Sequence, residues 1–495
     1  MTSDKFRWRR SLAASLALIV AASVLVRPVA ADGLPDLGDT AQADFSPQLE
    51  RKVGEQLYLE TRRRDPSYID DPELADYLDR LGQRLVEHLP GERMDVRMFL
   101  LADPTLNAFA WPGGFVGVHT GLWLAANSES ELAGVLAHEL AHLSQRHIAR
   151  LVQRQGQMSI ANLLSMAVAV LASRASSQVS QAALIAGQAV TVQAQLNYTR
   201  EFEREADRVG IQTLQDSGFD ARGMGSFFGR LLRESRLYEN NAPAYLRTHP
   251  LTTERIADVD NRLQNVPYRQ VPDSAEFRLY QEKLRARLGT PADAVKDFQR
   301  RLQQTGTAAQ GALRFGLTYA LLRANDLSAA ADELGRLRAA GLPVAPVEHL
   351  AGQIARARGD AVGAVRTYAA ARVRAPGDRV LLYGHIEAEL AAGQAESARR
   401  LAESALAERP RDERLSAYMA QAYGLLGQRA AQHAAQAESY AVQGMLSEAI
   451  EQLELAQRAG DGDFYRLSAI DARLRELRAR RADEKRDEGR RSRGG

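Results

Sequence analysis

Two histidines and a glutamate lie within five consecutive residues, in the pattern His-Glu-x-x-His at His138, Glu139 and His142. On a helix, residues four apart lie on the same face, so the imidazoles of His138 and His142 can bind one metal ion. Zinc lowers the pKa of a bound water towards about 7, and a neighbouring carboxylate can accept the proton as the water attacks an amide carbon. This spacing therefore predicts zinc-dependent peptide hydrolysis, with Glu139 as the base.

A third ligand has to come from elsewhere in the sequence. In the segment from Glu201 to Gly210, Glu203 and Asp207 are four apart on a predicted helix. One carboxylate could complete a two-histidine, one-glutamate site while the other orients a ligand histidine. The alternative is a chance motif beside an ordinary solvated acidic face. With 9 histidines in 495 residues, a chance His-Glu-x-x-His has a probability on the order of 1%.

The residues around the first motif have helical periodicity. Leucine and valine recur at three- and four-residue spacing from Leu132 to Leu143, and Ser128 with Glu131 forms a capping box at the start. Two further amphipathic helices are predicted upstream, within residues 46–89. We expect these two helices to pack behind the helix that carries the motif.

Two apolar segments before this helix, 96–102 and 115–123, are bounded by proline or glycine and are predicted strands. The second leads almost directly into the motif helix, and a strand in that position can pair with an extended peptide. We therefore predict a substrate-binding strand that includes Gly114, Phe115 and Val116. His119 lies on the same strand without a ligand spacing, so we expect it to be structural.

The other histidines are poorer candidates for the same metal. His147 follows His142 by five residues, and a continued helix would turn it by about 140° away from the pair. We therefore expect a surface or packing residue at this position. His349, His385 and His433 have no ligand residues beside them in the sequence and are predicted to bind no metal.

The first 31 residues have the features of a cleavable export signal. Basic residues precede an apolar run from Leu12 to Val26, and small residues follow as far as Ala31. A run of about 15 residues is shorter than the roughly 20 that a spanning helix needs, which favours cleavage near Ala31 over a retained anchor. The mature chain is therefore expected to be exported.

Composition limits the remaining possibilities. The chain has no cysteine, so disulfides are excluded and a metal must be held by histidine and carboxylate. The formal net charge of +2 falls to −2 when the signal, with five basic residues and one acid, is removed. This near-neutral charge argues against a nucleic-acid partner. The remaining 464 residues are enough for two or three domains.

Residues 155–199 contain few charged residues and many glutamines and serines. These polar residues argue against a membrane span, so we expect a helical hairpin that is buried or covers the active site. A shallow, peripheral contact with a membrane through 155–199 stays open as an alternative.

Beyond about residue 270 the sequence repeats itself. Gly359, Gly393 and Gly427 are each 34 residues apart, and Asn325 stands 34 residues before the first of them. This interval is typical of tetratricopeptide repeats, which are helix pairs that stack into a curved array suited to binding proteins. The interval breaks at Gly444, 17 residues after Gly427, so we expect an irregular helix near the end of the array.

These observations divide the chain into four parts. An export signal at 1–31 precedes a metalloprotease domain at 32–268, a repeat domain at 269–475 and a charged tail at 476–495. The tail has almost no apolar residues, so we expect it to be disordered. The predicted fold class is an α+β zincin-type metalloprotease domain followed by an all-α tetratricopeptide-repeat solenoid.

Four motifs follow one another in the chain: Asn107-Ala108-Phe109-Ala110, Gly113-Gly114, His138-Glu139-x-x-His142 and Glu203-x-x-x-Asp207. This ordered set resembles the gluzincin zinc metallopeptidases that include the HtpX heat-shock protease and the prenyl-protein CAAX endopeptidase. The resemblance covers about residues 45–265. It implies one Zn²⁺ per chain held by His138, His142 and Glu203, with Glu139 as the catalytic base and Asp207 as a supporting acid.

The resemblance also draws attention to His249, which lies in a polar segment before Pro250. A zinc site of this family leaves one coordination position open. His249 could stabilise the oxyanion of the reaction, or it could occupy that position and keep the enzyme latent. An ordinary loop histidine is the alternative.

The resemblance further implies a periplasmic endopeptidase that acts in quality control and assembly of outer-membrane proteins. Its expected partners are unfolded or stalled outer-membrane proteins and, through the repeats, the β-barrel assembly machinery. The alternative is a chaperone-like repeat scaffold in which proteolysis is latent or secondary. The intact Glu139 favours the enzyme, because a degenerate site has no need of a base.

Overall fold

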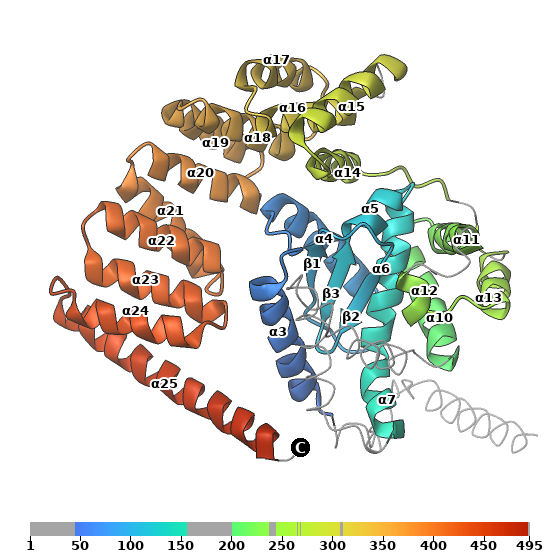
Figure 1. The fold of residues 1–495 in the computed structure, drawn as a ribbon, viewed down its shortest axis with the longest axis horizontal. Helices are drawn as coiled ribbons and strands as arrows, with labels where there is room; N and C mark the ends of the chain where they lie inside the picture. Colours follow the sequence, from blue (N-terminus) through green and yellow to red (C-terminus); the bar gives the residue numbers. More distant parts are fainter. Residues whose placement is uncertain are drawn as a thin grey trace, which may run out of the picture.

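The computed structural model describes residues 45–155, 200–236, 244–264, 266–267, 269–306 and 310–493. A three-stranded sheet and its helices form the first part, and helices alone form the rest (Figure 1). The predicted class, an α+β domain followed by a helical-repeat array, is confirmed. The predicted export signal and residues 156–199 of the predicted hairpin lie outside the described residues.

The first part begins with two helices whose starts are encoded locally. Ser46 and Asp71 each accept a backbone hydrogen bond at a helix start, and a proline follows each of them. The elements of this part are α3 Pro47–Arg64, α4 Pro72–Val86, β1 Arg97–Leu101, β2 Ala108–Trp111, β3 Phe115–His119, α5 Thr120–Ala125, α6 Glu129–Ser144, α7 His147–Gln155, α10 Arg200–Asp216, α11 Arg222–Arg236, α12 Ala244–Thr248 and α13 Thr253–Gln264.

The sheet has the order β1-β3-β2, with β3 parallel to β1 and antiparallel to β2. The central strand β3 has neighbours on both sides, so the predicted role of Gly114, Phe115 and Val116 in pairing with a substrate strand is wrong. The sequence pattern indicated a strand here but not its neighbours, and the short strand β2 was not predicted. Gly113 and Gly114 have φ of 72° and 94° and form the turn between β2 and β3.

Helix α6 lies at the centre of the first domain. Ser128 caps it by accepting from the backbone N–H of Glu131 at 3.2 Å, as the capping box predicted. Every residue from Glu129 to Leu143 is buried. The helix packs against α4 and β2 on one side and against α10 and α11 on the other (Figure 1). The motif histidines therefore lie inside the domain.

The helical array consists of antiparallel helices stacked in order. Asn325, Gly359, Gly393, Gly427 and Gly444 all have φ between 58° and 81°, which confirms that the 34-residue positions mark turns. Its elements are α14 Ala275–Arg287, α15 Pro291–Gln304, α16 Gln310–Arg323, α17 Leu327–Arg338, α18 Val344–Ala357, α19 Ala361–Arg374, α20 Arg379–Ala391, α21 Ala395–Glu408, α22 Glu413–Leu425, α23 Arg429–Val442, α24 Leu446–Arg458 and α25 Phe464–Arg493.

Helix α14 joins the two domains. Phe277, Tyr280 and Leu284 are part of the core around the sheet, whereas Leu279 and Ala286 are part of the first core of the array. The predicted boundary after residue 268 falls just before this helix. Helix α14 packs against α4 and α5 of the first domain and against α15 and α16 of the array, so it contributes to both cores.

The later repeats curve back to the first domain, so that the array follows an arc around α3 and α4 (Figure 1). Ion pairs join the two, including Arg62 with Glu413 at 2.8 Å and Arg379 with Asp76 at 3.1 Å. A cavity of about 500 Å³ lies between them, lined mainly by arginine, tyrosine and acidic residues. Part of the inner side of the array therefore faces the first domain.

The end of the chain differs from the sequence-based expectation of a disordered tail. Helix α25 continues through residue 476 as far as Arg493. Arginine, glutamate and alanine favour helix, and side-chain pairs such as Arg481 with Glu484 at 3.4 Å support it. Leu477 at the start of this segment is buried in the last core of the array, and the residues after it continue the helix without further buried apolar side chains among those described.

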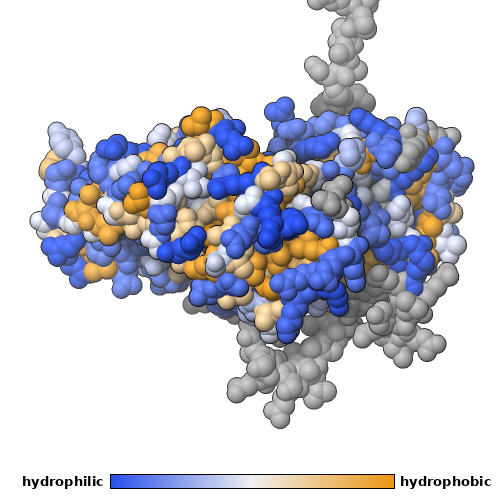
Figure 2. All heavy atoms as spheres, turned by 90° about the horizontal axis from the view of Figure 1, so that it is seen from above, coloured by the Kyte–Doolittle hydropathy of each residue, from blue (hydrophilic) through white to orange (hydrophobic). Residues whose placement is uncertain are grey.

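Within the described residues, no helix is both long enough and apolar enough to cross a membrane. Figure 2 shows one face of the molecule, where hydrophilic residues predominate and hydrophobic residues gather mainly towards the middle. Large apolar side chains that are exposed, such as Val373, Phe464 and Tyr465, lie on the array rather than around the motif helix.

Candidate metal centre

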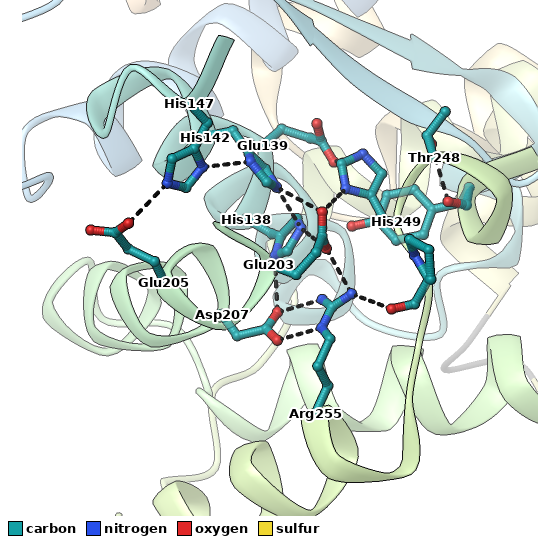
Figure 3. Close-up of polar contacts among 12 residues, drawn as sticks. His138, Glu139, His142, His147, Glu203, Glu205, Asp207, Thr248, His249 and Arg255 are labelled. Carbon is teal, nitrogen blue, oxygen red and sulfur yellow. Dashed lines mark hydrogen bonds and ion pairs between the residues drawn. The ribbon is translucent and has the colours of Figure 1, made fainter. Parts of the chain in front are cut away.

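His138 and His142 lie on adjacent turns of α6, as their spacing predicts. Their Nε2 atoms are 3.0 Å apart, and their rings meet edge to face with centroids 4.7 Å apart (Figure 3). Both side chains are fully buried. Two imidazole nitrogens therefore point at one small region inside the domain.

Glu203 reaches the same region from α10. Its Oε1 is 3.5 Å from His142 Nε2, and its Oε2 is 3.4 Å from His138 Nε2. Gly210 permits this close approach of the helices, because a Cβ there would lie 3.2 Å from the backbone nitrogen of His138. The predicted meeting of two distant helices is present in the structure.

Asp207, one turn after Glu203, lies behind His138 rather than at the centre of the cluster. Its Oδ1 is 3.0 Å from His138 Nδ1, and Arg255 donates to both of its oxygens at 2.8 Å. Arg255 also contacts Glu203 Oε2 at 2.6 Å. Oε1 of Glu203 therefore faces His142, whereas Oε2 contacts the guanidinium of Arg255.

His249 completes the cluster from the segment after α12. Its Nδ1 is 3.0 Å from Glu203 Oε1, and its Nε2 is 3.4 Å from Glu139 Oε1. The ring stacks on Tyr245, with centroids 4.7 Å apart. Only 1% of the His249 surface is exposed, so it is not an ordinary loop histidine.

The buried charges shift the pKa values of the cluster in opposite directions. Burial alone would lower the pKa of His138, but hydrogen bonds and charges from Asp207 and Glu203 raise it to about 9. Burial lowers the pKa of His142 well below its usual value. Burial would raise the pKa of Glu203, but the neighbouring histidines outweigh it and hold that pKa well below normal. Glu203 is thus ionised and able to act as a ligand.

Glu139 lies on the far side of the cluster from Asp207. Burial raises its pKa, an effect that the charges of His249 and His138 partly oppose. Both of its carboxylate oxygens are buried without a well-formed hydrogen bond in the described part of the chain. A carboxylate with a raised pKa and free acceptor oxygens is suited to accept a proton.

His147 does not lie where a continued helix would place it. Helix α6 ends before Arg146, which has a φ of 50°, and a separate helix, α7, starts at His147. The His147 Nδ1 lies 2.7 Å from His142 Nδ1, and its Nε2 lies 3.2 Å from Glu205 Oε2 (Figure 3). The expected surface position is wrong, although the ring does pack against Phe202.

The donor set fits a metal ion. One atom each of His138, His142, Glu203 and His249 can be chosen so that all lie within 4.8 Å of one another. Three imidazoles and one carboxylate are the ligand types that zinc and related divalent ions take in a four-coordinate site. Among the described residues, the contacts of the buried Glu203 carboxylate are with imidazoles and one guanidinium. Burying this charge is favourable when a cation is bound.

Sequence reasoning found the cluster but missed the residues that orient it. It named His138, Glu139, His142, Glu203, Asp207 and His249, and the structure brings all six together. It did not find Arg255, Tyr245 or the pair His147 and Glu205. Glu205 lies between Glu203 and Asp207 in the sequence. Residues two apart face different sides of a helix, so the spacing that pairs Glu203 with Asp207 leaves Glu205 out.

Comparison with known proteins gives the family. Residues 72–263 match the sequence model of peptidase family M48. The chain is 32% identical over 449 residues to the beta-barrel assembly-enhancing protease of Escherichia coli strain K12, across 90% of this chain and 92% of that protein. The chain belongs to peptidase family M48.

Other relatives of this M48 peptidase share smaller parts. A Vibrio cholerae protein described by the same protease name is 39% identical over 285 residues, which are 57% of this chain and 58% of that protein. The mitochondrial metalloendopeptidase OMA1 of Schizosaccharomyces pombe is 28% identical over 226 residues, which are 44% of this chain and 63% of that protein. The predicted family and the predicted enzyme class, a metalloendopeptidase, are confirmed.

Proposed function

We propose that this M48 peptidase is a zinc-dependent endopeptidase with one Zn²⁺ per chain. The observation that carries the proposal is the cluster of His138, His142, Glu203 and His249, whose ligand atoms lie within 4.8 Å of one another. His138, His142 and Glu203 would hold the ion, which supplies a Lewis acid that polarises a peptide carbonyl and acidifies water. Glu139 is the general base, and Asp207 acts by fixing His138.

Among the described residues β2 has no strand on its outer side, which supports binding of an extended substrate at β2 instead of β3. His119 N–H donates to the Asn107 carbonyl at 3.0 Å, so alternate residues of β2 bond to β3 and the others face outward. By this alternation, the backbone groups of Ala108 and Ala110 face away from β3. The outward carbonyl of Leu106 accepts from Tyr245, next to His249, so this edge leads to the cluster.

The relatives support a biological setting for this enzyme. The protein of Escherichia coli is named for enhancing beta-barrel assembly, and this chain matches it along nearly its whole length. We therefore place this enzyme in the periplasm, with unfolded or stalled outer-membrane proteins as substrates. The repeat array would dock substrates or the β-barrel assembly machinery through the surface that does not face the peptidase domain.

Metal analysis and digestion of an unfolded test protein examine this proposal together. The purified mature chain should contain about one zinc per molecule and cleave the test protein. Glu139→Gln keeps the metal ligands but removes the base, so it should retain zinc and lose about 10²–10⁴-fold in rate. A wild-type protein without bound metal, or a Glu139→Gln protein with full activity, would contradict the proposal.

The burial of the cluster favours a second function, in which proteolysis is latent and the repeats act as a chaperone-like scaffold. His249 lies within the ligand cluster, and no residue of the cluster is exposed by more than 1%. A substrate carbonyl can therefore reach it only after this region moves. Complementation of a deletion strain by Glu139→Gln distinguishes the two: rescue supports the scaffold, and loss of rescue with zinc retained supports the protease.

A further inference from the structure

His147 is held in place by contacts on both sides of its ring. The ring is fully buried and stacks on Phe202, with centroids 4.5 Å apart and planes 11° apart. Its two nitrogens point to different partners, His142 Nδ1 at 2.7 Å and Glu205 Oε2 at 3.2 Å. Arg150 also donates to Glu205 Oε2 at 2.8 Å, which fixes the carboxylate as an ionised acceptor.

These contacts determine where the protons lie. An ionised carboxylate can only accept, so the proton of the neutral His147 ring is on Nε2, and its Nδ1 carries a lone pair. At 2.7 Å one of the two facing Nδ1 atoms must donate, so His142 Nδ1 carries the proton. The lone pair of His142 is then on Nε2, the atom that faces Glu203 and His138.

The same logic applies to the other motif histidine. Asp207 Oδ1 lies 3.0 Å from His138 Nδ1 and is itself held by Arg255, so this carboxylate favours a proton on His138 Nδ1. One histidine is oriented directly by a carboxylate, and the other is oriented by a carboxylate acting through a second imidazole. Both arrangements present Nε2 to the centre of the cluster.

We propose that His147 is a positioning residue. Glu205 keeps the proton of His147 on Nε2, so His147 Nδ1 accepts from His142 Nδ1 and the lone pair of His142 Nε2 is available to the metal. The inference rests on the proposed metal site. The left-handed backbone of Arg146 is what makes it possible, because this residue ends α6 and turns His147 back towards His142. The Arg146 side chain holds this turn by donating to Glu50 and to the carbonyl of Phe45.

Two substitutions separate positioning from simple packing. In His147→Phe the ring still fills the space and stacks on Phe202, but it offers no acceptor to His142. In His147→Asn much of the packing is lost, but the amide oxygen can occupy the position of Nδ1 and accept. Packing alone predicts that Phe is the milder change, whereas positioning predicts that Asn is.

The measurement is the affinity of the full mature chain for Zn²⁺, by competition with a chelator, and the visible spectrum of the Co²⁺ form. His147→Phe should weaken zinc binding about 10–100-fold and alter the Co²⁺ spectrum, while His147→Asn should stay within about threefold of wild type. The reverse order, or equal affinity of wild type and His147→Phe, would overturn the inference. A wild type that binds neither metal would instead overturn the proposed function.

If His147→Phe fails to fold, a substitution of the partly exposed Glu205 still tests the inference. Glu205→Ala removes a carboxylate that is 27% exposed and leaves the His147 ring in place. It should weaken zinc binding several-fold. The matched control is Asp216→Ala, which removes an exposed carboxylate from the other end of the same helix and should leave affinity unchanged. Equal affinities of these two variants would contradict the inference.

Discussion

Arg255 and Asp207 form a two-pronged ion pair beneath the metal cluster, in which Nε and Nη2 of the arginine each donate at 2.8 Å to a different carboxylate oxygen. Only 2% of Arg255 and 1% of Asp207 is exposed. The guanidinium also contacts Glu203 and the carbonyl of Pro250, the residue after His249. One side chain therefore ties together the helix that supplies the third ligand and the segment that supplies His249.

Replacement of Arg255 should destabilise the domain. Arg255→Ala leaves the buried carboxylates of Asp207 and Glu203 without their cation, which should lower the free energy of unfolding by about 3 kcal/mol. Urea unfolding of the metal-free protein measures this change. Arg262→Ala is the control, because Arg262 lies on the same helix and forms only an exposed pair with Asp258. Similar losses of unfolding free energy in both variants would show that the buried ion pair stabilises the domain no more than the exposed pair does.

His249→Ala should change proteolysis in a direction that identifies its role. If His249 occupies a coordination position, its removal opens that position, and the rate of digestion should rise about tenfold while zinc binding weakens. If it stabilises the oxyanion, the rate should fall about 10²-fold at unchanged zinc content. Because His249 lies within the ligand cluster, we expect the increase. An unchanged rate and zinc content would remove His249 from the site.

Gly114 should prove structural. A Cβ at Gly114 would lie 2.2 Å from the carbonyl oxygen of Asp95, and its φ of 94° is unfavourable for other residues. Gly91 has a φ of 104° with open space around it, so Gly91→Ala reproduces the backbone strain alone. Gly114→Ala should lower the melting temperature by several degrees more than Gly91→Ala. Equal shifts would show that the contact with Asp95 relaxes freely.

The link between α4 and α14 should depend on pH. Lys283 is buried, contacts Glu73 and lies 2.7 Å from Asp71. Burial alone would raise the pKa of Asp71, but the charge and hydrogen bond of Lys283 lower it below normal. The folded state thus binds this proton less readily than the unfolded chain, so the stabilisation is present above about pH 4 and is lost as pH falls further.

Asp71→Asn tests this dependence, because asparagine still caps α4. The variant should be about 2 kcal/mol less stable than wild type at pH 7, and the difference should shrink below about pH 4. Urea unfolding at both pH values provides the comparison. Asp326→Asn changes the exposed cap of α17 and should have little effect at either pH. A difference that stays constant with pH would contradict the assigned role of Lys283.

The sequence by itself determined the elements whose signals are local. The capping residues Ser46, Asp71 and Ser128, the histidine spacing on α6 and the 34-residue interval of turn glycines each depend on residues within one or two helical turns or one repeat. The carboxylate motif on α10 was found in the same way. These features require no knowledge of what packs against them.

Only the tertiary structure decided which segments meet. The order of the sheet, which puts β3 in the centre, depends on pairing with β1 and β2 and left no mark in the strand itself. Arg255 reaches Asp207 across 48 residues. His147 reaches His142 because one left-handed residue ends the helix, whereas a periodic pattern assumes that the helix continues. Periodicity describes one element at a time, and the orientation of a metal site depends on contacts between several.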